Sequence, residues 1–330
     1  MPVQVSYPGV YIEEIPSGVR TITGVATSIT AFLGRAIWGP TNDPVMINSF
    51  GDFERQFGGL GVNYPLSYAV RDFYLNGGSQ ALIVRLYKDP ATASDATASL
   101  TVDDLSLAAK SPGEWGKQLR ATLDVEVPDE MRTRLGLSAT DALFNLTIRF
   151  GNNVEKFLNL TVTDNARRID RVLKAESSLV EWKGTWPTTA PTVPKVAAAR
   201  TALDALNAAL KATPPVTATI NAARAAYEAA KLDLDDPVTK AEKQLAAALA
   251  ATPQVPGDIT TAENALKTAK DNMKGSNGGA LDQNSYEVSK ANKTGLYALD
   301  KADLFNLLCI PPDNRDTDTL PAVYQTAMLY

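Results

Sequence analysis

The chain has 330 residues, of which 45% are hydrophobic and 21% charged, and its formal net charge at pH 7 is −5. This balance offers no basic face for a nucleic-acid backbone. Histidine is absent, which excludes Ser-His-Asp catalysis, His-ligated zinc and imidazole proton relays. The single cysteine, Cys309, cannot form an internal disulfide, and its apolar neighbours predict a buried, unreactive thiol. No stretch approaches the roughly 18–20 apolar residues of a membrane span, and the start lacks the pattern of a signal peptide.

Residues 1–20 are predicted to form an extended arm. Val3, Val5 and Tyr7 alternate with polar residues, which is a strand pattern, and Pro8-Gly9 interrupts it before a second extended run begins at Val10. Two short strands split by Pro-Gly have little to bury against each other. The arm is therefore either a terminal strand of its own domain or an edge strand added to another sheet.

Residues 21–90 read as a compact α/β unit. A strand over residues 27–34 and another over 81–86 enclose two predicted helices. Ser49 is placed to cap the first helix, which ends at Gly58-Gly59, and Pro65 opens the second. The order strand, helices, strand predicts a crossover connection within one sheet, and the continuous apolar character of residues 81–86 predicts a strand covered on both faces.

Residues 91–190 are predicted to form a β-rich inserted domain. Apolar and polar residues alternate over 121–127 and 144–150, and Gly151 starts a hairpin turn toward a third strand over 157–162. We expect these strands to pair antiparallel.

Residues 191–275 change character and are rich in alanine, with proline breaks. Four segments carry helical apolar spacing and predict helices that pack on one another as a hairpin pair or small bundle, an insertion projecting from the fold. Asp236 before Pro237 predicts a helix N-cap, and Thr260 with Glu263 resembles a capping box.

Residues 276–330 are predicted to be a polar linker, over 276–292, followed by a return to the core with strand character over 299–310. The chain stops at Tyr330 in what reads as the first turns of an apolar-faced helix. We therefore expect the natural protein to continue, with the C-terminal part of the core missing from this chain.

No motif for phosphate binding or catalysis is found. The glycine-rich stretches lack the Lys-Ser/Thr that a phosphate-binding loop needs. The acidic pairs Glu13-Glu14, Asp103-Asp104 and Asp235-Asp236 consist of adjacent residues, which point to opposite faces of a strand, so we interpret them as surface charges or helix caps. We expect no enzyme activity, no cofactor and no metal.

Five stretches together match a known family. They are residues 7–14 (YPGVYIEE), 24–40 with Gly39-Pro40 at the end, 50–59 (FGDFERQFGG), 66–85 with Asn76-Gly77-Gly78 and Val84-Arg85, and 111–116 (SPGEWG). Residues 305–311 (FNLLCIP) fit the family's return to its core. In order and spacing the chain resembles the sheath protein of contractile phage tails, R-type bacteriocins and extracellular contractile injection systems. The resemblance covers residues 1–120 and about 295–330; the alanine-rich helices lie outside it.

The resemblance implies a fold class and an architecture: an α/β core, a mixed sheet flanked by helices, with the arm, the β-rich domain and the helical insertion attached. It implies a structural subunit that polymerises as stacked hexameric rings around an inner tube and contracts to drive the tube through a target membrane. Partners are then copies of itself, the inner tube protein, and baseplate and tail terminator proteins, with no nucleic acid and no direct membrane insertion. The location is a virion or phage-tail-like particle assembled in the producing bacterium's cytoplasm. The arm residues expected to contact a neighbouring subunit by strand exchange are Val3, Val5, Tyr7, Pro8, Gly9, Val10, Tyr11 and Ile12.

Two alternatives stay open at this point. One is a sheath-like terminator or baseplate component of a contractile particle, which copy number in the particle distinguishes from a sheath. The other is a carboxylate-based hydrolase, whose acids would have to converge in a cavity of the folded core.

Overall fold

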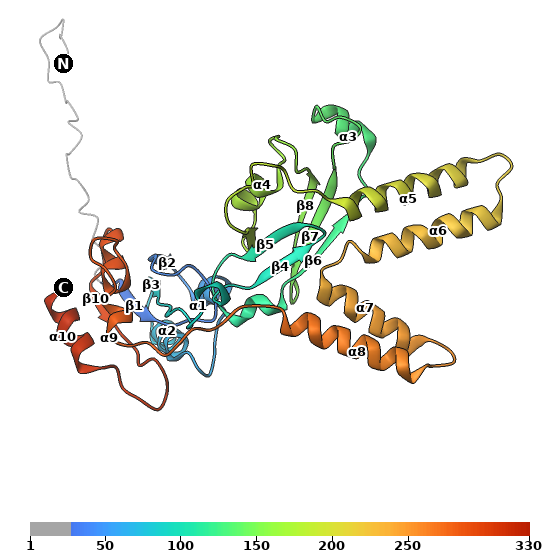
Figure 1. Cartoon of the computed structure of the whole chain (residues 1–330). Helices are drawn as coiled ribbons and strands as arrows, with labels where there is room; N and C mark the ends of the chain where they lie inside the picture. The colour runs from blue at the N-terminus through green and yellow to red at the C-terminus, as the bar shows by residue number, and fades with distance from the viewer. Residues whose placement is uncertain (1–27) are drawn as a thin grey trace, which may run out of the picture.

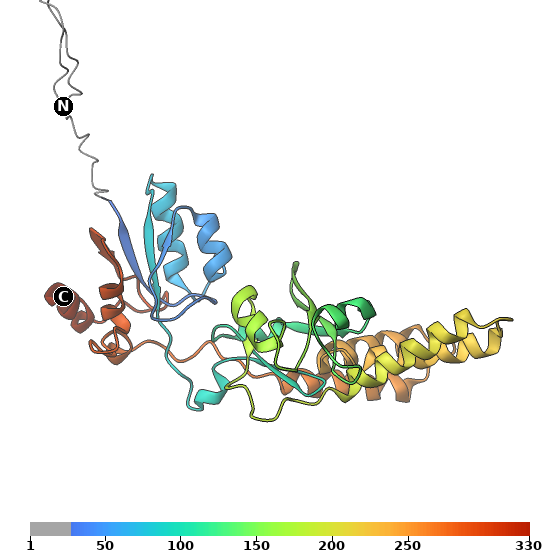
Figure 2. The ribbon, with the colours of Figure 1, turned by 90° about the horizontal axis from the view of Figure 1, so that it is seen from above.

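A computed structural model describes residues 28–330 and has a mixed α/β fold (Figure 1). Viewed from above, the molecule is elongated, with a core sheet at one end, two helical hairpins at the other and a β-rich unit between them (Figure 2). The core elements are β1 (Thr30–Gly34), β2 (Val45–Ile47), α1 (Phe50–Phe57), α2 (Pro65–Leu75), β3 (Ala81–Arg85), α9 (Gln283–Tyr286), the 3-10 helix η3 (Gly295–Lys301), β10 (Leu307–Cys309) and α10 (Pro321–Leu329).

The core sheet has the strand order β10-β1-β3-β2. β1 pairs parallel with both β3 and β10, and β2 pairs antiparallel with β3. The predicted crossover is therefore confirmed. Ala81 and Ile83 pack toward α1 and α2, whereas Leu82 and Val84 pack toward η3 and α10, so β3 is buried on both faces as its apolar sequence predicted.

Helix α1 begins and ends where the sequence predicts. The Ser49 hydroxyl accepts the backbone N–H of Asp52 at 3.1 Å, and Gly58 ends the helix in the left-handed region at φ 95°. Phe53 and Phe57 lie on one face and are fully buried against the sheet. Their burial fixes α1 beside β2 and leaves α2 beside β1.

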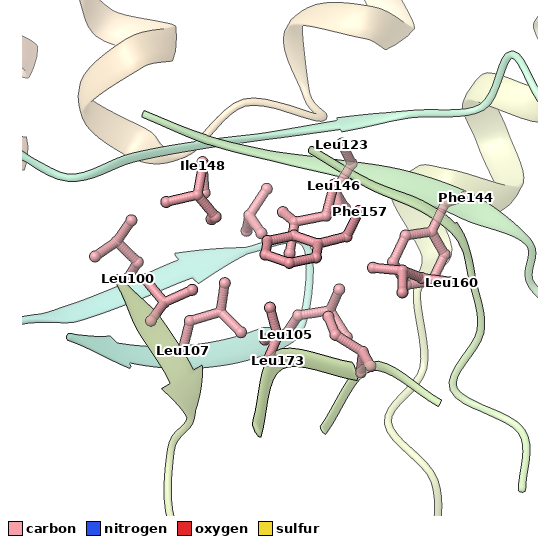
Figure 3. Close-up of a cluster of buried hydrophobic side chains, with 14 of the residues drawn as sticks. Leu100, Leu105, Leu107, Leu123, Phe144, Leu146, Ile148, Phe157, Leu160 and Leu173 are labelled. Carbon is pink, nitrogen blue, oxygen red and sulfur yellow. The ribbon is translucent and has the colours of Figure 1, made fainter. Parts of the chain in front are cut away.

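The β-rich unit between β3 and the hairpins consists of two three-stranded antiparallel sheets, ordered β4-β5-β9 and β6-β7-β8. Its elements are η1 (Ala93–Asp95), β4 (Ser99–Val102), β5 (Leu105–Ala109), η2 (Glu114–Gln118), β6 (Arg120–Asp124), α3 (Asp129–Arg134), β7 (Phe144–Phe150), β8 (Asn153–Leu160), α4 (Ile169–Glu176) and β9 (Val180–Trp182). The predicted antiparallel strands are confirmed. Figure 3 shows Phe157 among leucines from both sheets, with Leu173 of α4 closing the same core.

Four helices follow: α5 (Pro194–Lys211), α6 (Thr217–Leu232), α7 (Pro237–Ala250) and α8 (Pro256–Asp271). α5 packs on α6 and α7 on α8, giving two hairpins that diverge from the β-rich unit (Figure 1). Asp236 caps α7 through the backbone N–H groups of Val238 and Thr239, as predicted. The capping box at Thr260 is wrong: Pro256 starts α8 one turn earlier, and the Thr260 hydroxyl donates to the Pro256 carbonyl inside the helix.

The return to the core differs in part from its prediction. Residues 276–279 lie along the end of β3, where Gly279 donates its backbone N–H to the Lys88 carbonyl at 3.1 Å. The strand expected over 299–310 is only the short β10, because a 3-10 helix, entered at Gly295 with φ 69°, occupies the residues before it. The helix expected at the end of the chain is α10.

Arg85 joins the core to the β-rich unit. Its side chain is 1% exposed, and the guanidinium donates to the carbonyls of Ala36 at 3.1 Å, Gly39 at 2.8 Å and Pro112 at 2.8 Å. Burial lowers the pKa of Arg85 to about 10. Beside it the indole of Trp38 contacts Phe150 of the β-rich unit, with ring centroids 5.2 Å apart. A charge and an aromatic contact therefore hold this junction.

Candidate subunit interface

One edge of the core sheet is open in the part of the chain that the structure describes. β10 is the edge strand, and in residues 28–330 no strand pairs with the side that faces away from β1. Leu307 on this strand is 57% exposed, whereas every residue of the central strands β1 and β3 is buried. Such an edge is able to accept a further strand, either from another chain or from a part of the protein outside residues 28–330.

The register shows which backbone groups of β10 are available. Leu307 donates its N–H to the Ile29 carbonyl at 3.2 Å, and β10 runs parallel to β1. In a parallel ladder, successive residues direct their N–H and C=O groups to opposite sides of the strand. The N–H and C=O of Leu308 therefore point away from β1, toward the open edge.

A groove lies beside this edge, between the sheet and α2. The residues that line it are Ser28, Thr30, Phe32, Ala69, Asp72, Phe73, Asn76, Gly77, Gly78, Leu307, Leu308 and Cys309. Its volume is about 700 Å³, and most of its surface is apolar. It is therefore suited to the side chains of an extended peptide rather than to a polar metabolite.

Thr30 gives the groove an unsatisfied polar group. Its side chain is 5% exposed, and the hydroxyl has no hydrogen-bond partner among the described residues. A buried hydroxyl without a partner costs about 1–3 kcal/mol.

Cys309 also lines the groove and is half-buried. Burial raises the pKa of its thiol, so the nucleophilic thiolate is disfavoured. The sequence analysis expected a buried thiol, but Cys309 is only half-buried because it belongs to an edge strand. The expected low reactivity agrees with the raised pKa of the thiol.

The opposite edge, β2, is partly occupied. The Tyr74 hydroxyl donates to the Ile47 carbonyl at 2.8 Å, so one backbone acceptor of β2 already has a side-chain partner. Burial raises the pKa of Tyr74 to about 12, and the phenol stays protonated as a donor. β10 is thus the better acceptor edge.

The predicted contact residues of the arm, Val3, Val5 and residues 7–12, lie outside the described residues. The expected strand exchange by the arm therefore stays a prediction. The sequence analysis did not single out the open edge of β10. A signal was present in residues 305–311, where an apolar run of strand length follows a polar segment and ends at Pro311.

The described acidic pairs hold helix ends. Asp103 accepts the backbone N–H groups of Lys195 and Val196 at the start of α5, each at 3.0 Å. Asp235 forms an ion pair with Lys243 at 2.6 Å, and Asp236 caps α7. Among residues 28–330 no cluster of acidic or sulfur ligands suited to a metal ion is found. None of the helices in that range is both long and apolar enough to cross a membrane.

No family model and no curated protein matches this chain. Among solved structures, it is similar to a sheath tail protein from Listeria innocua, with 19% sequence identity and a TM-score of 0.34 over 56% of this chain and 39% of that chain. It is also similar to a sheath tail protein from Desulfitobacterium hafniense, with 16% identity and a TM-score of 0.32 over 56% of this chain and 38% of that chain. The chain thus spans about two fifths of the length of these proteins.

Proposed function

We propose that this chain is a structural subunit of a contractile tail sheath. The observation that carries the proposal is the open β10 edge with its apolar groove. The five sequence stretches that resemble the sheath family support the same function. Copies of the chain then form stacked hexameric rings around an inner tube.

The arm of one copy supplies the strand that the next copy lacks. Residues 3–12 lie beside β10 of the neighbour, and their backbone pairs with the free N–H and C=O of Leu308. Each such hydrogen bond contributes about 1 kcal/mol net. Val3, Val5 and Tyr7 share one face of an extended segment, and this face fills the groove beside Phe73.

The chain is long enough for this exchange. Residues 13–27 separate the pairing segment from the first described residues, and 15 extended residues span at most about 50 Å. That reach exceeds the diameter of one small domain. Pro8 and Gly9 allow the arm to bend within the pairing segment, between residues 3–7 and residues 10–12.

Contraction needs no fuel site in this account. The extended sheath is a metastable assembly, and its cores repack at lower free energy while the arms keep the lattice connected. A difference of a few kcal/mol per subunit, multiplied over many subunits, drives the tube through a membrane. The other partners are the inner tube protein and the baseplate and terminator proteins of the same particle.

Two proline substitutions test the proposal at neighbouring positions of one strand. Leu308→Pro removes an N–H that points to the open edge, so we expect the subunit to fold and to lose polymerisation. Leu307→Pro removes the N–H that bonds Ile29, so we expect a loss of stability instead. Deletion of residues 1–20 is expected to give the same folded, non-polymerising protein as Leu308→Pro.

Sedimentation and electron microscopy of the full-length protein measure polymerisation, and thermal unfolding measures stability. Tubes formed by the deletion variant or by Leu308→Pro at the wild-type concentration would contradict strand exchange at β10. A wild-type protein that stays monomeric at high concentration would contradict the sheath function itself.

A further inference from the structure

The two helical hairpins are copies of one sequence. Of the 30 residues 202–231, 14 are identical to the residue 39 positions later, and 7 of these 14 are not alanine. The backbone agrees: the residues that end α5 and α7, Ala212 and Ala251, have φ,ψ of −63°,141° and −62°,142°. We call α5–α6 hairpin A and α7–α8 hairpin B. A repeated supersecondary unit of this kind indicates duplication of a packing module.

Both hairpins keep an apolar tip that the fold does not bury. Leu210 and Leu249 are 50% and 49% exposed, and Val216 and Val255 are 53% and 48% exposed. The residues between them, which include Thr213-Pro214 in hairpin A and Thr252-Pro253 in hairpin B, are largely identical. About half of each side chain stays exposed at matching positions, and contact with another molecule would bury this apolar surface.

The charges on the hairpins differ in a regular way. Arg224 and Glu228 form an exposed stripe on α6, and the equivalent residues on α8 are Glu263 and Lys267, so both charges are reversed. A third charge is reversed on the other helix of each hairpin: Asp204 on α5 corresponds to Lys243 on α7. Lys231 and Lys270, nearer the base of the hairpins, keep the same charge.

The two stripes do not meet in one copy. The hairpins diverge in Figure 1, and within residues 28–330 no hydrogen bond or ion pair joins a stripe residue of α6 to one of α8. Arg224, Glu263 and Lys267 have no ion-pair partner in the described part of the chain. Glu228 forms an exposed ion pair with Lys231 of its own helix at 3.8 Å, and the other three stripe charges are available to another molecule.

We propose that hairpin A of one copy packs side by side with hairpin B of the next copy, so that Arg224 faces Glu263 and Glu228 faces Lys267. Copies arranged around one axis present their hairpins in the same direction, and a parallel pair brings equivalent positions together. The partner is thus a second copy of this chain, and the contact rests on the assembly proposed above. Because A binds B and never itself, the contact is heterologous and propagates through a ring or helix.

Single surface ion pairs are weak, so the stripes set register and partner choice, and the apolar tips add buried area. Contact within a lattice multiplies the effect of each pair. The helical insertion is on this account an outer layer of contacts, separate from the strand exchange at β10.

Disulfide capture tests the contact in the full-length protein. On a Cys309→Ser background, Asn221→Cys and Thr260→Cys place one thiol on each stripe, at equivalent exposed positions. Disulfides form only when Cα atoms approach within about 7 Å. We expect oxidation of the assembled protein to give a ladder of dimers, trimers and longer chains. Asn221→Cys alone is the matched control and is expected to give no ladder.

Charge exchange then shows whether the stripes direct the pairing. Arg224→Glu with Glu228→Arg on hairpin A is expected to slow ladder formation at least tenfold, as is Glu263→Arg with Lys267→Glu on hairpin B. All four substitutions together are expected to restore the ladder, which general misfolding would not do. A four-fold variant no faster than the two-fold variants would overturn the proposal.

Two further outcomes separate this inference from the proposed function. Assembly into tubes with no ladder, or with a cross-link inside single chains only, would overturn the hairpin contact and leave the sheath function standing. Failure of the protein to assemble, with no ladder, would overturn both.

Discussion

The guanidinium of Arg85, at the end of β3, donates a hydrogen bond of 2.8 Å to the carbonyl of Pro112, 27 residues further along the chain. This bond joins the core sheet to the β-rich unit. The same side chain bonds the carbonyls of Ala36 and Gly39, so one buried charge fixes both sides of the junction.

Arg85→Lys is expected to destabilise the protein by about 2–3 kcal/mol, because an ammonium cannot reach three carbonyls from the position of the planar guanidinium. Chemical denaturation measures the free energy of unfolding. Arg71→Lys, at a half-buried position with an ion pair to its neighbour Asp72, is the control and is expected to change stability by less than about 0.5 kcal/mol. Equal effects of the two substitutions would contradict the role of Arg85.

Tyr227 anchors hairpin A to the β-rich unit. It is 5% exposed, and its hydroxyl donates to Glu126 at 3.0 Å. Burial raises the pKa of the phenol, which keeps the donor proton in place. Tyr227→Phe is expected to cost about 1 kcal/mol in the free energy of unfolding. Tyr68→Phe removes a hydroxyl with no hydrogen-bond partner among the described residues and is expected to have no effect; a loss as large as that of Tyr227→Phe would refute the anchor.

Acid is expected to destabilise the return of the chain to the core. Asp282 accepts from Lys88 at 2.7 Å and caps α9, and these bonds hold the pKa of its carboxyl below the ordinary 3.8. A lowered folded-state pKa contributes stability above about pH 4 and loses it as pH falls further. Asp282→Asn should therefore lower Tm at pH 7, and its difference from the wild type should shrink steadily as pH falls below about 4. A Tm difference that is constant with pH would contradict this assignment.

Leu307→Lys is expected to block polymerisation with little effect on Tm. Leu307 is 57% exposed on the open edge, and a charge there opposes the addition of an apolar strand. Met46→Lys, at the β2 edge where the side chain is 41% exposed, is the matched control and should leave assembly intact. Loss of assembly in Met46→Lys but not in Leu307→Lys would show that the contact lies at the β2 edge and not at β10.

Local signals predicted much of the fold. Ser49 and Gly58 mark the ends of α1, Asp236 caps α7, and alternation over residues 144–150 gave β7, because each of these patterns acts within a few residues. α4 was not predicted, since it has eight residues, as α1 does, but no capping side chain at Arg168 and no glycine at its end to mark it. The short β10 was overestimated because apolar spacing does not separate a strand from a 3-10 helix.

The candidate interface depended on long-range pairing and was not predictable in detail. Nothing near Leu307 indicates that it pairs with β1, which lies more than 270 residues earlier. The role of Arg85 was likewise hidden, because its acceptors come from two distant loops. The sequence indicated an arm that donates a strand; the acceptor edge emerged only from the sheet topology.

Electron cryomicroscopy of the assembled particle tests the central claim most directly. The account predicts an outer helical layer in which residues 3–12 of one subunit run as an additional strand along β10 of the next, with Tyr7 beside Phe73. A map in which β10 has no added strand, or in which each arm pairs with the sheet of its own subunit, would contradict it.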